Sequence, residues 1–163
     1  MPRPDATCSN LVRMIAVVQR VSEASVTVAG HEHGRIGAGL CVLLGVERGD
    51  AVGQADWIAG KLARLRIFRD AEDRMNRSVQ DVSGSVLVVS QFTLAGDCAK
   101  GNRPSFIRAA DPPVGEALYE RVIQQLADVH ALPVQTGVFG AMMDVQLVND
   151  GPVTMIIQRD PDA

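Results

Sequence analysis

Several groups that mark particular protein classes are scarce in this chain. Aromatic residues make up only 4% of it, so the hydrophobic core has to be built from aliphatic side chains. Three cysteines, Cys8, Cys41 and Cys98, form no CxxC pair, which disfavours a disulfide framework and favours free thiols in a reducing compartment, the cytoplasm. No apolar run approaches the ~20 residues that cross a bilayer, so we expect no membrane span.

Positive charge and metal-binding side chains are scarce as well. The formal net charge is −3, which argues against a broad duplex-binding surface but leaves room for contact with one RNA end. Of the three histidines, His31 and His33 flank Glu32 in a predicted polar turn. Because no further ligands accompany them, we expect no metal and no cofactor.

The residues present are patterned for one α+β domain, mostly antiparallel, which suits a chain of 163 residues. Helical periodicity predicts a first helix, capped by Asp50 and reaching Leu65, and a second helix that begins at residues 111–113. Short links predict that the first three strands form an antiparallel meander. The predicted strands are residues 14–22, 24–29, 39–45, 85–94, 134–139, 144–148 and 153–158. Residues 1–13 are predicted to be a flexible extension and residues 159–163 a tail, with the domain between them.

Two stretches carry the polar chemistry. Residues 85–94 begin as a buried strand and turn polar at their end, which is a way to present a site on a rigid element, although many strand ends are simply polar. Residues 149–152 (NDGP) carry a strong turn signal.

Two groups of basic residues allow alternative interpretations. Residues 95–106 form a loop that is locally basic through Lys100 and Arg103, with Arg108 just beyond it. A second group, at the end of the first predicted helix, is either solvated or a contact for RNA phosphates; it comprises Lys61, Arg64, Arg66 and Arg69.

Residues 90–94 (SQFTL), followed by residues 149–154 (NDGPVT), resemble the paired signature of the D-aminoacyl-tRNA deacylases. The similarity extends from residue 14 to residue 158 and includes residues 103–106 (RPSF). This resemblance implies a homodimeric, barrel-like α+β domain. It also implies an enzyme that hydrolyses the ester between a D-amino acid and the 3′-terminal adenosine of a tRNA, and possible action on glycyl-tRNA.

The resemblance implies a composite site at which two subunits meet. It assigns catalysis to residues 90–93, namely Ser90, Gln91, Phe92 and Thr93. Substrate binding falls to Phe92 and to Met143, Gly151 and Pro152, with the Gly-Pro pair contributed by the other subunit and its peptide bond cis. Its carbonyl groups would accept hydrogen bonds from the substrate's α-ammonium, so that an L side chain collides with the backbone.

Two positions depart from the usual pattern of the family. Val138 stands where the family often has Arg, and Met142 stands where it often has Asp. Both positions flank the implied site, so the departures bear on the range of substrates.

The residues themselves suggest how the ester is cleaved. No Ser-His-Asp arrangement is visible, and neither Ser90 nor Thr93 has an evident activating base. We therefore favour a mechanism in which the substrate's ribose 2′-hydroxyl assists water, while backbone amides near Phe92 and Thr93 receive the oxyanion. Phe92 either packs on the terminal adenine or fills the core. The alternatives are a nucleic-acid-binding homodimer without catalysis and a hydrolase with a Ser or Thr nucleophile.

Overall fold

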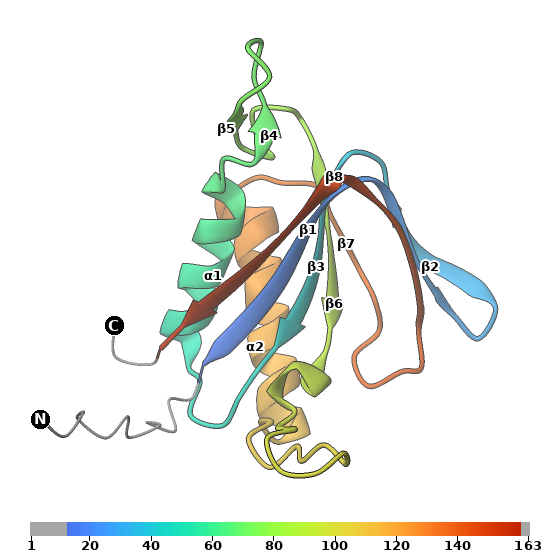
Figure 1. Ribbon diagram of the computed structural model, residues 1–163, viewed down its shortest axis with the longest axis vertical. Helices are drawn as coiled ribbons and strands as arrows, with labels where there is room; N and C mark the ends of the chain where they lie inside the picture. Colours follow the sequence, from blue (N-terminus) through green and yellow to red (C-terminus); the bar gives the residue numbers. More distant parts are fainter. Residues whose placement is uncertain (1–12, 161–163) are drawn as a thin grey trace, which may run out of the picture.

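The computed structural model describes residues 13–160, so residues 1–12 of the predicted extension and residues 161–163 of the predicted tail fall outside this range. Arg159, the first residue of the predicted tail, is the last residue of a strand. Two helices lie against one face of a curled sheet (Figure 1). The helical elements are α1 (Val52–Arg64), a 3-10 turn η1 (Phe92–Ala95), α2 (Pro112–Gln124) and its π-helical continuation η2 (Gln125–Val129). The strands are β1 (Met14–Val28), β2 (His31–Ile36), β3 (Gly39–Gly45), β4 (Phe68–Arg69), β5 (Met75–Arg77), β6 (Ser85–Ser90), β7 (Val134–Thr136) and β8 (Asp144–Arg159).

The main sheet is mixed, with the strand order β2-β1-β3-β6-β7 and with β8 also paired to β1. Strands β2, β3 and β8 run antiparallel to β1, whereas β3–β6 and β6–β7 are parallel. The α+β class is confirmed, but the predicted meander is wrong, because its first two strands are the single strand β1, which pairs directly with β3. Strand β1 is long enough for both partners: residues 15–21 pair with β3 and residues 24–28 pair with β2.

Several predicted element boundaries are also wrong. Residues 14–22 and 24–29 belong to the single strand β1, and residues 144–148 and 153–158 belong to the single strand β8. Residues 149–152 are therefore not a hairpin turn but an irregularity in the β1–β8 ladder, where long pairing with β1 overrides the local Gly-Pro signal. Strand β6 ends at residue 90 rather than 94, and β7 covers only residues 134–136.

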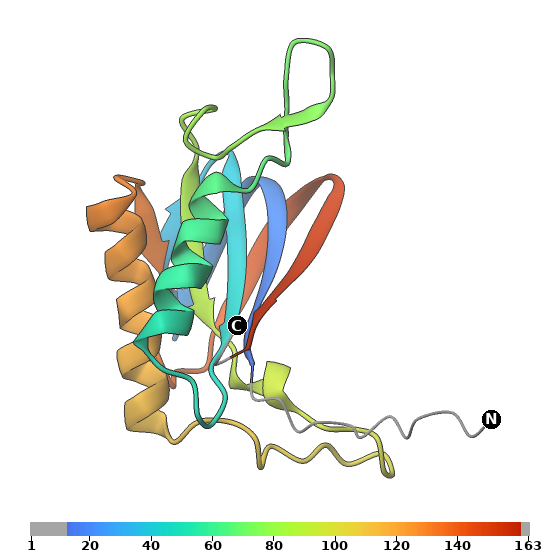
Figure 2. The same ribbon diagram turned by 90° about the vertical axis from the view of Figure 1, so that its left-hand side faces the viewer.

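The sheet curls until its ends meet. Figure 2 shows α1 and α2 on one side of it, where they cover an aliphatic core contributed by β1, β3 and β6. A second core cluster lies on the opposite face, inside the curl. Gly34 of β2 leaves room there for the Thr136 carbonyl of β7, because a Cβ at Gly34 would lie 3.0 Å from that oxygen. The expected barrel-like sheet is thus nearly closed.

The histidines and cysteines have simple surroundings. His31 and His33 lie in β2 rather than in a turn, because the turn before it is formed by residues 29–30, and both side chains are exposed. Cys41 and Cys98 are free thiols, and burial raises the pKa of Cys41 to about 11. Within residues 13–160 no group of three His, Cys, Asp or Glu side chains is arranged to hold a metal ion. None of the described helices is long and apolar enough to span a membrane.

Asp50 is not the N-cap of α1; that position belongs to Ala51. The Asp50 carboxylate is instead buried, 7% exposed, and accepts a hydrogen bond of 2.8 Å from the Glu47 backbone N–H. Burial raises the pKa of Asp50 to about 6. The raised pKa means that the folded protein holds the Asp50 proton more tightly than the unfolded chain does.

We expect Asp50 to make the free energy of unfolding fall as the pH rises from about 4 to about 6, by at most about 3 kcal/mol. Well above pH 6 the carboxylate is ionised in both states, so its contribution to the free energy of unfolding no longer changes with pH. Asp50→Asn should remove this component, which urea unfolding of both proteins at pH 4.5 and pH 7 would measure. A stability difference between the two proteins that is the same at both pH values would contradict this assignment.

Candidate active site

A pocket of about 560 Å³ lies at the carboxyl end of β6. Three segments form it: the end of β6 with the start of η1, the loop before α2, and the loop between β7 and β8. Its lining comprises Val89, Ser90, Gln91, Phe92, Ala109, Ala110, Pro112, Phe139, Gly140, Ala141, Met142, Met143 and Val145. None of these side chains is ionisable.

The structure brings most of the predicted site residues together. Ser90, Gln91, Phe92 and Met143 all line the pocket. Thr93 is next to it, and its hydroxyl oxygen accepts a hydrogen bond from the Gln91 side-chain amide. The site therefore joins residues about fifty positions apart in the sequence, because β7 pairs with β6 and the loop after β7 continues beside the end of β6.

The turn η1 is held closely against β3. The Gln91 N–H donates to the Leu44 carbonyl at 2.8 Å, and a Cβ on Gly45 would lie 3.1 Å from the Gln91 carbonyl oxygen. The first N–H groups of such a turn have no acceptor within it, so those of Phe92 and Thr93 are available to a ligand. Glycine at position 45 thus sets how closely these amides approach the sheet.

Phe92 is not a core residue, because its side chain is 59% exposed. Its ring packs edge-on against Phe106, with 5.2 Å between the ring centroids. An exposed aromatic face beside a pocket suits a base or another flat apolar group.

Tyr119 of α2 supports the pocket from behind. Its hydroxyl donates a hydrogen bond of 3.0 Å to the Val88 carbonyl, and its ring contacts Phe139. Burial raises the pKa of Tyr119 to about 12, so the phenol remains a donor at neutral pH. Sequence reasoning missed Tyr119 and Phe139; the spacing of Tyr119 within the apolar stripe of α2 was its only signal.

Gly151 and Pro152 do not line this pocket. Both are exposed, and the peptide bond between them is cis, which confirms that expectation. Gly151 has φ +132°, a conformation that an L residue rarely adopts. Asn149 stabilises the segment around Gly151 and Pro152, because its side-chain oxygen accepts a hydrogen bond of 2.8 Å from the Val153 N–H.

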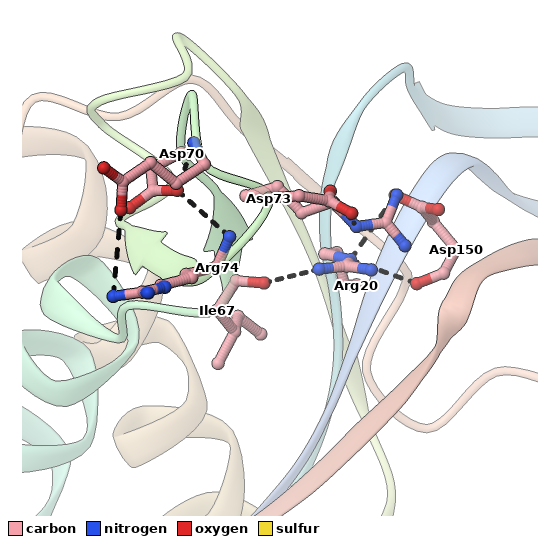
Figure 3. Close-up of polar contacts among 8 residues, drawn as sticks. Arg20, Ile67, Asp70, Asp73, Arg74 and Asp150 are labelled. Atoms are coloured by element: carbon pink, nitrogen blue, oxygen red, sulfur yellow. Dashed lines mark hydrogen bonds and ion pairs between the residues drawn. The ribbon is translucent and has the colours of Figure 1, made fainter.

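Arg20 fixes the other side, and Figure 3 shows it between two backbone segments. Its side chain is 2% exposed; Nε donates to the Asp150 carbonyl at 3.0 Å and Nη1 donates to the Ile67 carbonyl at 2.7 Å. The Asp150 carboxylate lies 3.4 Å from the same guanidinium. Arg20 is therefore a positioning residue for Gly151. A sequence signal existed, since Arg20 continues the inward-facing alternation of Met14, Ala16 and Val18.

Within the chain the two motifs lie far apart. The turn η1 packs on Gly45, which pairs with Ile15 of β1, whereas Gly151 lies beside Arg20. Five residues of β1 separate these positions, which corresponds to about 17 Å along a strand. One chain alone therefore does not bring Gly151 and Pro152 to the pocket.

The two departures from the family pattern lie at the rim. Met142 is 92% exposed and Val138 is 36% exposed. The Met143 sulfur accepts a hydrogen bond of 3.4 Å from the Val138 N–H. This bond holds the Met143 side chain against the loop between β7 and β8. The rim is consequently apolar at both positions.

Solved structures share this fold. One of them, described as a probable eukaryotic D-amino acid tRNA deacylase, matches with a TM-score of 0.78 at 20% identity over 90% of this chain and 100% of its own, which shows the fold alone. Another, described as c-Myc DNA Unwinding Element Binding Protein, matches with a TM-score of 0.83 at 41% identity over 88% of this chain and 97% of its own.

Sequence comparison identifies the family. Residues 17–158 match the D-Tyr-tRNA(Tyr) deacylase family. A D-aminoacyl-tRNA deacylase of Desulfitobacterium hafniense (strain Y51) is 55% identical over 90% of this chain and 98% of its own. A D-aminoacyl-tRNA deacylase of Paracoccus denitrificans is 58% identical over 87% of this chain and 95% of its own. The chain belongs to the D-aminoacyl-tRNA deacylase family, a family of ester hydrolases, which confirms the resemblance seen in the sequence.

Proposed function

We propose that this protein hydrolyses the ester bond of D-aminoacyl-tRNA in the cytoplasm and releases the free D-amino acid and the tRNA. Family membership supports this substrate, and the pocket supports the reaction. The observation that carries the mechanism is that the pocket is lined entirely by uncharged residues around the start of η1. The described pocket thus offers hydrogen-bond donors and an aromatic surface but supplies no general base.

An aminoacyl ester is already activated, so positioning and oxyanion stabilisation can account for much of the rate. The ribose 2′-hydroxyl of the terminal adenosine assists the attacking water. The Phe92 and Thr93 amides receive the charge that develops on the carbonyl oxygen, and Phe92 stacks on the adenine. Ser90, Gln91 and Met143 shape the pocket around the ester.

The site is completed by a second copy of the chain. Strand β8 pairs only with β1, so its other edge is open along the described chain. Three of its large apolar side chains are exposed: Val148, Met155 and Ile156, the last by 67%. An open edge with apolar side chains is suited to pairing with another strand. The homodimer brings the Gly151 and Pro152 of one subunit to the pocket of its partner.

Chiral selection follows from this arrangement. Proline has no N–H, so Gly151 and Pro152 offer carbonyl oxygens, which accept hydrogen bonds from the substrate's α-ammonium. With the ammonium and the ester both held, a D side chain points to solvent and an L side chain runs into the backbone. Glycine has no side chain to collide, so glycyl-tRNA is also hydrolysed.

A non-catalytic nucleic-acid-binding dimer is the main alternative. One observation favours it: the solved structure at 41% identity is described as a DNA-binding protein. The net charge of −3 disfavours it, because duplex binding requires an extended basic surface.

We expect substitution of the terminal ribose by 2′-deoxyribose to slow hydrolysis of D-tyrosyl-tRNA by at least ~100-fold, the usual contribution of acid–base assistance. Single-turnover deacylation of the two substrates would measure this. A tRNA with 2′-deoxyribose only at the penultimate nucleotide serves as the control and should react at the normal rate. Equal rates for the ribose and 2′-deoxy 3′ ends would exclude assistance by the RNA.

Thr93→Ala tests the alternative hydrolase with a covalent nucleophile. Because the Thr93 hydroxyl only shares a hydrogen bond with Gln91, we expect kcat to fall by no more than about tenfold, the value of one such bond. Steady-state deacylation would report this. Loss of a covalent nucleophile would instead lower kcat by several orders of magnitude.

A further inference from the structure

The segment between η1 and α2 leaves the body of the protein directly beside the pocket. Figure 2 shows it extending below the sheet and the helices. Residues that line the pocket flank it: Phe92 in the turn η1 before it, and Ala109 and Ala110 at its return. A strand of RNA that places its 3′ end in the pocket can therefore emerge next to this segment.

Part of this segment is a defined hairpin, which we call the basic loop (residues 97–105). Asp97 and Ser105 exchange two backbone hydrogen bonds of 2.8 and 2.9 Å across its base. The Asp97 carboxylate also accepts a hydrogen bond of 2.9 Å from the Ala99 N–H. The next residue after the loop is Phe106, whose ring packs on Phe92. The base of the loop is thereby fixed relative to the aromatic wall of the pocket.

The basic loop carries two cations, Lys100 and Arg103, both exposed. Neither makes an ion pair or a hydrogen bond with any residue in the range 13–160. Other exposed arginines differ, since Arg35 pairs with a carboxylate at 2.8 Å and Arg69 pairs with another at 3.3 Å. Chain reach limits both loop cations to positions within about 11 Å of the loop base, measured between Cα atoms.

We infer that the basic loop binds the phosphodiester backbone of the RNA strand whose 3′ end occupies the pocket, with Lys100 and Arg103 each contacting a phosphate. This inference rests on the proposed function. It explains how an acidic protein holds an RNA: two unpaired cations beside the pocket supply attraction where the strand leaves it, without a basic surface elsewhere.

The basic end of α1 is a weaker candidate for this contact. It lies by the β4–β5 hairpin, at the opposite end of the molecule from the loop (Figure 1). Three of its four cations have partners: Lys61 lies 5.1 Å from the centre of the Trp57 ring, Arg66 donates to the Asn76 carbonyl at 3.0 Å, and Arg69 pairs with a carboxylate at 3.3 Å. These contacts indicate a solvated helix end whose cations are already engaged in part.

The test compares two substrates, D-tyrosyl-tRNA and D-tyrosyl-adenosine, which has no phosphate. For Lys100→Gln combined with Arg103→Gln, we expect kcat/KM on the tRNA to fall roughly tenfold at low salt. The slope of log kcat/KM against log salt concentration should become shallower by about 1.4–1.8, which corresponds to two lost phosphate contacts. Hydrolysis of D-tyrosyl-adenosine should not change. The control, Lys61→Gln combined with Arg64→Gln, removes the same charge from the end of α1 and should behave as wild type.

Three results would overturn the inference: an unchanged salt slope in the loop variant, an equal loss on both substrates, or the same loss in the α1 control. Wild-type protein that hydrolyses neither substrate would instead contradict the proposed function, and the inference with it. The two failures are therefore distinguishable, because a fault in the inference alone leaves wild-type activity intact.

Discussion

Gly151→Ala is expected to lower kcat/KM for D-tyrosyl-tRNA by at least ~100-fold, the cost of displacing a positioning group by about 1 Å. A Cβ at this position would lie 2.8 Å from Arg20 Nη2 and 2.9 Å from Val153 Cγ2. The backbone would also have to hold a non-glycine residue at φ +132°. Relief of these contacts moves the Gly151 and Pro152 carbonyls away from the substrate ammonium. Deacylation kinetics of the purified variant measure the effect.

Gly30→Ala is a matched control for backbone strain. Gly30 has φ +79° in the turn between β1 and β2, but nothing lies within 4 Å of a Cβ placed there. This variant should lose some stability and keep its activity. Thermal unfolding of both variants separates loss of fold from loss of function. A folded Gly151→Ala protein with wild-type activity would refute the role assigned to this motif.

The second large effect concerns dimers assembled from two defective subunits. Phe92→Ala damages the pocket, because base stacking on an aromatic side chain contributes about 1–3 kcal/mol, and Gly151→Ala damages the Gly-Pro motif. If the subunits exchange these motifs, a heterodimer of the two variants contains one site with both defects and one intact site. Its activity should therefore recover to about half of the wild-type value, although both sites are defective in each parent homodimer. Coexpression with two affinity tags and sequential purification isolates this heterodimer.

The reciprocal heterodimer is the control. It pairs a wild-type subunit with a subunit that carries both Phe92→Ala and Gly151→Ala. A composite site predicts that both of its sites are defective, so its activity should be low. A site contained within one chain predicts the opposite outcome in both heterodimers: no recovery in the first and half activity in the second.

Local pattern predicted the fold class and most strands, but it failed where long-range pairing decides the structure. Residues 149–152 carry the composition of a turn, yet they lie inside β8, because that strand is paired with β1 on both sides of them. Likewise, no local signal showed that residues 14–28 form one strand that pairs with both β2 and β3. Asp50 has the residue type of an N-cap, but its position makes it a buried acceptor for the Glu47 N–H instead.

Part of the candidate site was predictable because several of its residues are contiguous in the sequence. Ser90, Gln91 and Phe92 are neighbours in sequence, so a motif was enough to group them. Phe139 and the small residues before α2 are distant from this motif in the sequence, and only the tertiary fold brings them to the pocket. Their residue types alone suggest a core or loop position. Arg20 was predictable only in part. Its inward position follows from strand alternation, whereas its hydrogen-bond acceptors, the carbonyls of Ile67 and Asp150, depend on the tertiary fold.

The most direct test of the central claim is the deacylation rate of purified protein on D-tyrosyl-tRNA and on L-tyrosyl-tRNA under the same conditions. We predict that the D ester is hydrolysed at least ~100-fold faster, because the L side chain collides with the backbone at the Gly-Pro motif while the D side chain meets only solvent. Equal rates for the two esters, or no hydrolysis of the D ester, would contradict the account.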